Sequence, residues 1–189
     1  MTLEGQGALY LAALRRTRIA VPEGTLLYRA AEEVLEMAVA YQSDGMAFLR
    51  AGDHVNALAG FAYGLGWLDA GSRLGLLLPL AAHPPGGAGV YIPEALAARL
   101  DEKTHRYRRM LQSALPAIEV GPDEASPLSC GAEELRSTAR CWYTDGVNRL
   151  DAGDPAGALA RFSYGYAWLD AGIRAGLFRI TGERGLFTV

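Results

Sequence analysis

The chain contains two nearly identical segments. Residues 67–76 read WLDAGSRLGL and residues 168–177 read WLDAGIRAGL, 101 positions apart. At this fixed offset, 25 of the 51 positions in 27–77 are identical to their counterparts, without a gap. A period of 101 residues is far longer than the unit of a solenoid repeat. The sequence therefore predicts a tandem duplication in which each copy folds as a domain.

The duplicated unit is predicted to be helical. A Gly-Asp pair lies in the middle of each copy, at 52–53 and at 153–154. Glycine suits the left-handed residue that ends one helix, and aspartate suits the N-cap of the next. Two helices should therefore flank each pair, and a third should precede them. The predicted helices span about 6–18, 26–51 and 54–77, then about 93–116, 127–152 and 155–178.

This pattern predicts an all-α protein of two tandem three-helix bundles related by duplication, with a short extended C-terminal tail. Residues 1–82 form the first three-helix repeat, 83–92 a Pro/Gly linker, and 93–189 the second repeat plus the tail. Extended structure is expected only in the tail, 179–189. There the turn ITGERG favours a short hairpin.

Two series of residues with a spacing of seven run along the last helix of each copy, and they include three glycines. Ala57, Gly64 and Gly71 form one such series, and Phe61, Leu68 and Gly75 form another; all six recur in the second copy. Glycine inside a helix costs about 1 kcal/mol relative to alanine. Retaining these glycines in both copies favours close packing of another backbone against this stripe. A ligand lying against the glycines is the alternative.

Charged residues of the repeat predict a network of ion pairs. Asp69 precedes Arg73 by four residues, the favourable order for a pair on one helix. An antiparallel helix hairpin with its turn at 52–53 places Arg73 level with Glu32 and Glu33. The second copy repeats the set as Asp170, Arg174, Glu133 and Glu134. We expect an Asp–Arg–Glu network within each copy, and a functional anion or substrate site at the arginine is the alternative.

Another repeated acid, Asp44 (Asp145 in the second copy), is not expected to form a catalytic dyad with Asp69. The two lie eight residues apart in helix register, about 12 Å, which exceeds the carboxylate spacing of glycosidases. Asp44 could instead form a buried polar cluster with Tyr63 and Trp67, which are four residues apart. These aromatic residues and their copies, Tyr164 and Trp168, are predicted to lie in the core.

Other classes of function find little support in the sequence. The three histidines fall outside the matched positions, so neither a duplicated metal site nor a duplicated general base is expected, and no cofactor is predicted. The net charge of −3 argues against a dedicated nucleic-acid-binding protein. The longest apolar run has nine residues and includes a proline, too short for a membrane span. Two cysteines without a disulfide or zinc spacing indicate reduced thiols and a cytoplasmic location.

Two long segments carry a family resemblance. YQSDGMAFLRAGDHVNALAGFAYGLGWLDAGSRLGL and WYTDGVNRLDAGDPAGALARFSYGYAWLDAGIRAGLF resemble the archaeal domain of unknown function 357. That family is marked by a tyrosine and an aspartate late in one helix, a Gly-Asp turn, and a helix ending in GWLDAG.R.G. The resemblance implies three-helix bundles of the albumin-binding-domain type, without an established activity. The second copy resembles the family more fully, including its tail, so the role of the tail should be performed once.

We therefore expect a non-catalytic helical interaction or scaffold protein whose partner is another protein. A small-ligand-binding bundle using the Asp/Arg motif is one alternative. A degenerate nucleotide-binding helical domain related to RNases is another, although its Arg-x4–6-His motif is missing from the repeat helices. The two copies should pack on each other as a pseudo-dimer within one chain, as two family subunits would in a homodimer. A homo-oligomer of the whole chain is the alternative. Leu65 and Tyr166, flanked by Leu74 and Ala175, are the expected shared patch.

Overall fold

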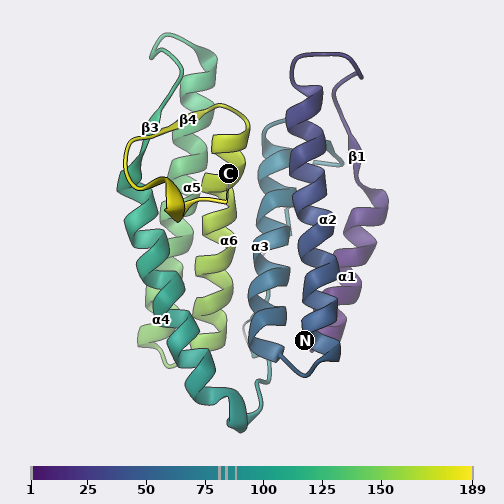
Figure 1. Ribbon diagram of the computed structural model, residues 1–189, viewed down its shortest axis with the longest axis vertical. Helices are drawn as coiled ribbons and strands as arrows, with labels where there is room; N and C mark the ends of the chain where they lie inside the picture. Colours follow the sequence, from purple (N-terminus) through teal and green to yellow (C-terminus); the bar gives the residue numbers. More distant parts are fainter. Residues whose placement is uncertain (1, 81, 84, 88, 189) are drawn as a thin grey trace.

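The computed structural model describes residues 2–80, 82–83, 85–87 and 89–188. Six α-helices in these residues form two three-helix units that lie side by side (Figure 1). They are α1 (Leu3–Arg16), α2 (Tyr28–Arg50) and α3 (His54–Arg73), then α4 (Ala97–Ala114), α5 (Pro127–Asp151) and α6 (Pro155–Arg174). Three single 3-10 turns, Glu94–Leu96, Leu115–Ala117 and Arg184–Leu186, complete the helical structure of these residues. The prediction of an all-α protein with two helical repeats is confirmed.

The Gly-Asp pairs form the predicted helix–helix turns. Gly52 and Gly153 have φ angles of 74° and 76°, in the left-handed region that favours glycine. The Asp53 carboxylate accepts the backbone N–H three residues later at 3.1 Å, and the Asp154 carboxylate does so at 2.8 Å. Both carboxylates therefore cap the N-terminus of the helix that follows.

The last helix of each repeat ends four residues earlier than predicted, at Arg73 and Arg174. Gly75 and Gly176 adopt φ angles of 72° and 73°. The next backbone N–H reaches back five residues to a helix carbonyl at 2.9 Å, as in a Schellman motif. These two glycines were expected inside the helix, and they terminate it instead.

Replacing Gly176 by alanine should lower the free energy of unfolding by about 1–2 kcal/mol, because a left-handed conformation is costly for a residue with a Cβ atom. The control is Gly131→Ala on α5, where an added Cβ has no atom within 4 Å. That substitution should be neutral or stabilising by up to about 1 kcal/mol. Urea unfolding of both variants measures the difference. Equal destabilisation would show that the left-handed conformation is not the cause.

Four short strands lie beside the helices toward one end of the molecule (Figure 1). β1 (Arg18–Ile19) pairs antiparallel with β2 (Leu77–Leu78), and β3 (Ile118–Val120) pairs antiparallel with β4 (Phe178–Ile180). The prediction that only the tail is extended is therefore wrong. In each repeat, the strand that follows the first helix pairs with the strand that follows the Schellman turn. The backbone N–H and C=O groups of the two strands thereby satisfy each other. The expected tail hairpin is replaced by the 3-10 turn at 184–186.

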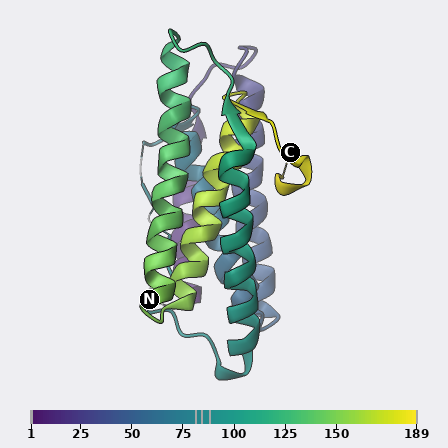
Figure 2. The same cartoon turned by 90° about the vertical axis from the view of Figure 1, so that its left-hand side faces the viewer.

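Helices α3 and α6 run next to each other through the middle of the molecule (Figure 1). In the view of Figure 2 the second unit lies in front of the first. Every residue of 57–72 and 156–172 is buried, as expected for helices surrounded on all sides. At their contact, a Cβ added to Gly66 would lie 2.6 Å from the Tyr164 carbonyl oxygen and 2.7 Å from Ala167 Cβ. Gly66 and Ala167 are equivalent positions of the repeats. The repeats thus meet through one shared patch, and their buried apolar residues form one core.

The glycine stripe packs against the outer helices of its own repeat. A Cβ on Gly64 would lie 2.8 Å from Tyr41 Cβ, and one on Gly165 would lie 3.0 Å from Trp142 Cβ. Close packing at these glycines is therefore confirmed, and protein atoms fill the space. Among the described residues, no helix combines the length and the hydropathy needed to cross a membrane.

Candidate functional site

The repeated aspartate and tyrosine of α3 and α6 bind each other across the repeat interface. The Tyr164 hydroxyl donates to Asp69 Oδ2 at 2.5 Å. The Tyr63 hydroxyl donates to Asp170 Oδ2 in the same way. Such reciprocal contacts, with each partner supplying both roles, are the property of an isologous interface. We call these two hydrogen bonds the crossed Asp–Tyr pairs.

The repeated arginines also cross between the repeats. Arg73 donates to Glu134 through Nε at 2.7 Å and through Nη2 at 2.5 Å. Arg174 Nη1 donates to Glu33 Oε2 at 3.1 Å. The predicted network within each copy is therefore wrong: in both copies the described salt bridge of the arginine is made to the glutamate of the other repeat. The hairpin register places the arginine level with its own glutamates, but the neighbouring unit lies within reach of its long side chain.

A separate chain segment covers each crossed Asp–Tyr pair. At Asp69 the linker residue His83 donates its backbone N–H to Oδ2 at 2.6 Å, and its ring Nδ1 lies 2.6 Å from Oδ1. At Asp170 the tail residue Thr188 donates its backbone N–H to Oδ1 at 3.2 Å. The linker therefore takes the place of the tail in the first repeat. This corrects the expectation that the role of the tail is performed only once.

Burial and hydrogen bonding set the protonation of this network. Burial raises the pKa of Asp170 to about 6, against the opposing effects of the Tyr63 and Thr188 hydrogen bonds and of the Arg174 charge. Burial and the nearby carboxylates raise the pKa of Tyr63 and of Tyr164 far above the ordinary tyrosine value. Both tyrosines therefore remain hydrogen-bond donors at neutral pH.

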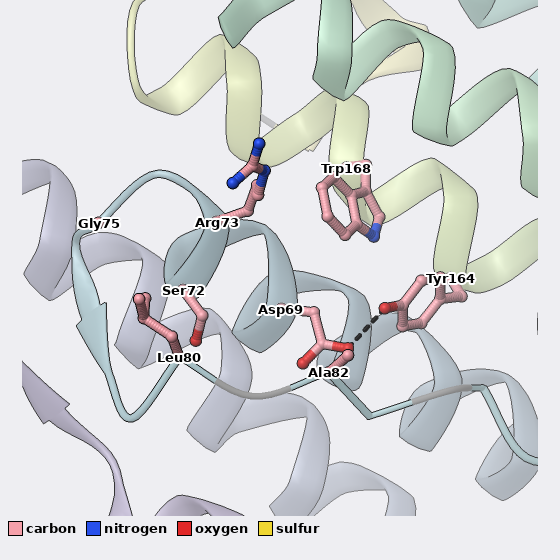
Figure 3. Close-up of a pocket in the computed structure, with 8 residues that line it drawn as sticks. All are labelled: Asp69, Ser72, Arg73, Gly75, Leu80, Ala82, Tyr164 and Trp168. Carbon is pink, nitrogen blue, oxygen red and sulfur yellow. Dashed lines mark hydrogen bonds between the residues drawn. The ribbon is translucent and has the colours of Figure 1, made fainter.

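A cavity of about 350 Å³ opens beside Asp69, and we call it the Arg73 cavity (Figure 3). The end of α3 contributes Arg73 to it, and α6 contributes Tyr164 and Trp168. The lining residues are Asp69, Ser72, Arg73, Gly75, Leu80, Ala82, Tyr164 and Trp168. The Tyr164 hydroxyl is directed at the Asp69 carboxylate, whereas the Arg73 guanidinium extends toward the second repeat. The cavity therefore combines the Arg73 guanidinium and the Asp69 carboxylate with apolar and aromatic walls.

The model of the family described as "Protein of unknown function (DUF357)" matches the chain twice, over residues 9–77 and over residues 106–178. The chain belongs to this family. The two matches confirm the tandem duplication of a DUF357 unit. The tail after residue 178 lies outside the second match, contrary to the expectation that the resemblance includes it. No curated protein and no solved structure matches the chain.

Asp44 and Asp145, the remaining repeated acids of this DUF357 protein, lie apart from the crossed Asp–Tyr pairs. Asp44 is exposed, so the predicted buried cluster with Tyr63 and Trp67 is wrong. Tyr63 binds Asp170 of the other repeat instead. Asp145 pairs at 2.7 Å with the buried side chain of Arg161 in its own repeat.

The aromatic residues of the repeat lie in the core, as predicted. Trp67 is fully buried and Trp168 is 7% exposed. Each ring packs against the tyrosine four residues earlier, with centroids 6.2 Å apart. Among the described residues, the indole N–H of either tryptophan has no hydrogen-bond partner.

Sequence reasoning missed three participants: His83, Thr188 and Gly66. His83 and Thr188 lie in non-repeated segments, and a search for repeated residues does not detect them. Gly66 was missed because its counterpart is alanine, although a small residue at both equivalent positions was a usable signal. Leu65 and Tyr166 are both buried: Leu65 lines a cavity with residues of α1, whereas Tyr166 packs on Phe187 and lines a cavity with Gly60 and Tyr63 of α3. In the described part of the chain, no group of three acidic, histidine or cysteine side chains is arranged to hold a metal ion.

Proposed function

We propose that this DUF357 protein is a non-catalytic helical scaffold that binds other proteins through its outer surface. The observation that carries the proposal is that the repeated aspartates are buried and hydrogen-bonded within the protein. Asp69 and Asp170 are 4% and 0% exposed, and each accepts a tyrosine hydroxyl and a backbone N–H. A catalytic acid or base must reach a substrate proton, and these carboxylates are engaged within the protein.

The outer surface carries a repeated apolar residue that the core does not explain. Leu27 and Leu128 occupy equivalent positions at the start of α2 and α5, and they are 47% and 60% exposed. Apolar side chains on the surface are what a protein–protein interface buries. The free thiols of Cys130 and Cys141 are also exposed, which supports a reducing compartment such as the cytoplasm. A protein partner therefore suits the chain better than a membrane or a nucleic acid.

Affinity capture with two matched variants tests the proposal. Proteins captured from host extract by the tagged full chain should be lost with the double variant Leu27→Ser/Leu128→Ser. They should be retained with Tyr63→Phe, which changes the buried motif and leaves the surface intact. Quantitative mass spectrometry measures capture, and circular dichroism at the assay temperature verifies folding. Retained capture by the leucine double variant would contradict the surface proposed here, and loss of capture by a folded Tyr63→Phe variant would contradict a structural motif.

Binding of a small ligand is a second candidate, favoured by one buried side chain. Gln6 is 2% exposed, and neither polar atom of its amide has a hydrogen-bond partner among the described residues. It lines a cavity of about 240 Å³ between α1 and the linker. A buried amide of this kind gains from a ligand that satisfies it. Thermal-shift screening of wild type against Gln6→Leu would show whether any stabilising compound depends on this amide.

The RNase alternative gains nothing from the structure. Arg99 and His105 do have the spacing of the Arg-x4–6-His motif, in the first helix of the second repeat, which lies outside the aligned segments 27–77 and 128–178. However, Arg99 binds Asp53 at 2.7 Å, and His105 lies 3.5 Å from Asp101 on its own helix. Each side chain thus has its own acidic partner, and we do not propose nuclease activity.

A further inference from the structure

The Arg73 cavity has an equivalent in the second repeat. Three of its lining residues, Asp69, Arg73 and Tyr164, correspond through the duplication to Asp170, Arg174 and Tyr63. Because the crossed Asp–Tyr pairs are reciprocal, each set combines one residue from the opposite repeat with two from its own. The same local geometry is therefore built twice, once on each side of the α3–α6 contact.

The equivalent position in the second repeat is occupied by the end of the chain itself. The Thr188 backbone N–H donates to Asp170, and its carbonyl oxygen accepts from Arg174 Nη2 at 3.4 Å. Its side-chain hydroxyl lies 3.2 Å from the Tyr63 hydroxyl. Phe187 beside it is buried against Tyr166. This pocket therefore holds the residues that follow the 3-10 turn, where the backbone becomes extended at Phe187, through both backbone and side-chain contacts.

The first repeat reproduces only part of that arrangement. His83 of the linker supplies the backbone N–H at Asp69, in place of Thr188. In the described residues, no carbonyl oxygen accepts from Arg73 as the Thr188 carbonyl does from Arg174, and the cavity lies at that position. The bonds to Glu134 use Nε and Nη2, which leaves Nη1 as a donor.

We propose that the Arg73 cavity binds the C-terminal end of an extended peptide from a partner protein. The terminal carboxylate binds Arg73, where the Thr188 carbonyl lies on Arg174 in the second repeat. Arginine pairs readily with carboxylates, and such charge-assisted hydrogen bonds are stronger than neutral ones. The last side chain packs on Trp168 and Leu80. This inference rests on the proposed scaffold function, for which it names the chemistry of one partner.

The test uses a peptide of known sequence as the probe. The heptapeptide GERGLFT, residues 182–188 of this chain, ends at the residue whose carbonyl lies on Arg174 in the equivalent pocket. It carries a fluorophore at its N-terminus and is titrated with the full chain, with binding measured by fluorescence anisotropy. We expect saturable binding of one peptide per chain. The C-terminally amidated peptide should bind about tenfold more weakly, because it lacks the charge that pairs with the guanidinium.

Two arginine variants locate the peptide. Arg73→Gln should weaken binding at least about tenfold, whereas Arg179→Gln, which removes the exposed pair with Glu119, should leave it unchanged. Because Arg73 is 56% exposed, its replacement should not unfold the protein, and circular dichroism verifies this. Wild-type affinity in Arg73→Gln would overturn the proposal, since the peptide would then have displaced the tail of the chain.

The remaining outcomes also decide the matter. No binding at about 1 mM peptide, a concentration that detects even weak complexes, would overturn the proposal. Equal affinity of the amidated peptide would overturn the role of the carboxylate. Either failure leaves the scaffold function standing if the capture that depends on Leu27 and Leu128 persists, so the two proposals fail separately.

Discussion

Replacing Gly66 by leucine should lower the free energy of unfolding by about 3 kcal/mol, because the contact between α3 and α6 has no room for a side chain. A Cβ at this position already lies 2.6 Å from a backbone oxygen of α6, and backbone cannot rotate away as a side chain can. The two central helices must therefore separate. Separation would expose apolar surface along helices that are buried on all sides.

The matched control for this variant is Gly131→Leu, a helical glycine of α5 with open space around its Cβ position. It should be neutral or slightly stabilising, because leucine is the better helix former. Denaturant unfolding followed by circular dichroism measures both variants. If Gly66→Leu were as stable as Gly131→Leu, the helices would have to be farther apart than the structure shows.

Local sequence signals predicted the six helices of the two repeats, but they did not predict the short strands outside the tail. The Gly-Asp turns followed from short-range rules, since a left-handed glycine and an N-cap aspartate act within a few residues. Gly75 was assigned to the helix interior because it fits the heptad spacing of Phe61 and Leu68. Spacing alone does not distinguish a packing glycine from a terminating one. In the structure the positive φ angle makes that distinction.

Partners across the interface could not be assigned from the sequence, because duplication gives every residue two equivalent candidates. Glu33 and Glu134 are identical positions, and Arg73 could pair with either. An argument from the register of one helix hairpin considers only that hairpin, so it always assigns Arg73 to the glutamates of its own copy. The missing information was the position of α6 beside α3. Apolar and small residues around the whole circumference of α3 could have indicated that position, since such helices are surrounded by protein.

The linker and the tail show how a duplicated interface can be completed by segments that are not duplicated. His83 and Thr188 offer the same backbone donor to equivalent carboxylates, although they lie 14 and 18 residues after them. A buried carboxylate needs such donors, and any chain segment that passes can supply one. Both aspartates can therefore recur while the segments above them differ. The difference leaves the Arg73 cavity open on one side of the molecule.

The stability of the protein should fall as the pH rises from about 4 to about 6, and Asp170→Asn should remove this part of the pH dependence. Burial raises the pKa of Asp170 in the folded protein to about 6, from an ordinary value of 3.8. The folded state therefore holds this proton more tightly than the unfolded chain does. The associated stability is complete below the unfolded pKa and is lost as the pH rises through the folded one. The loss should reach roughly 3 kcal/mol.

Urea unfolding of wild type and Asp170→Asn at intervals between pH 4 and 7 isolates this contribution, because other titrating groups affect both proteins alike. The difference in unfolding free energy between wild type and variant should decline across this range and become constant above about pH 7. Tyr63→Phe provides a second check. It removes the hydrogen bond that lowers the pKa of Asp170, so its transition should move to higher pH. Parallel pH profiles for wild type and Asp170→Asn would mean that the pKa of Asp170 is the same in the folded and unfolded states, which would contradict the prediction.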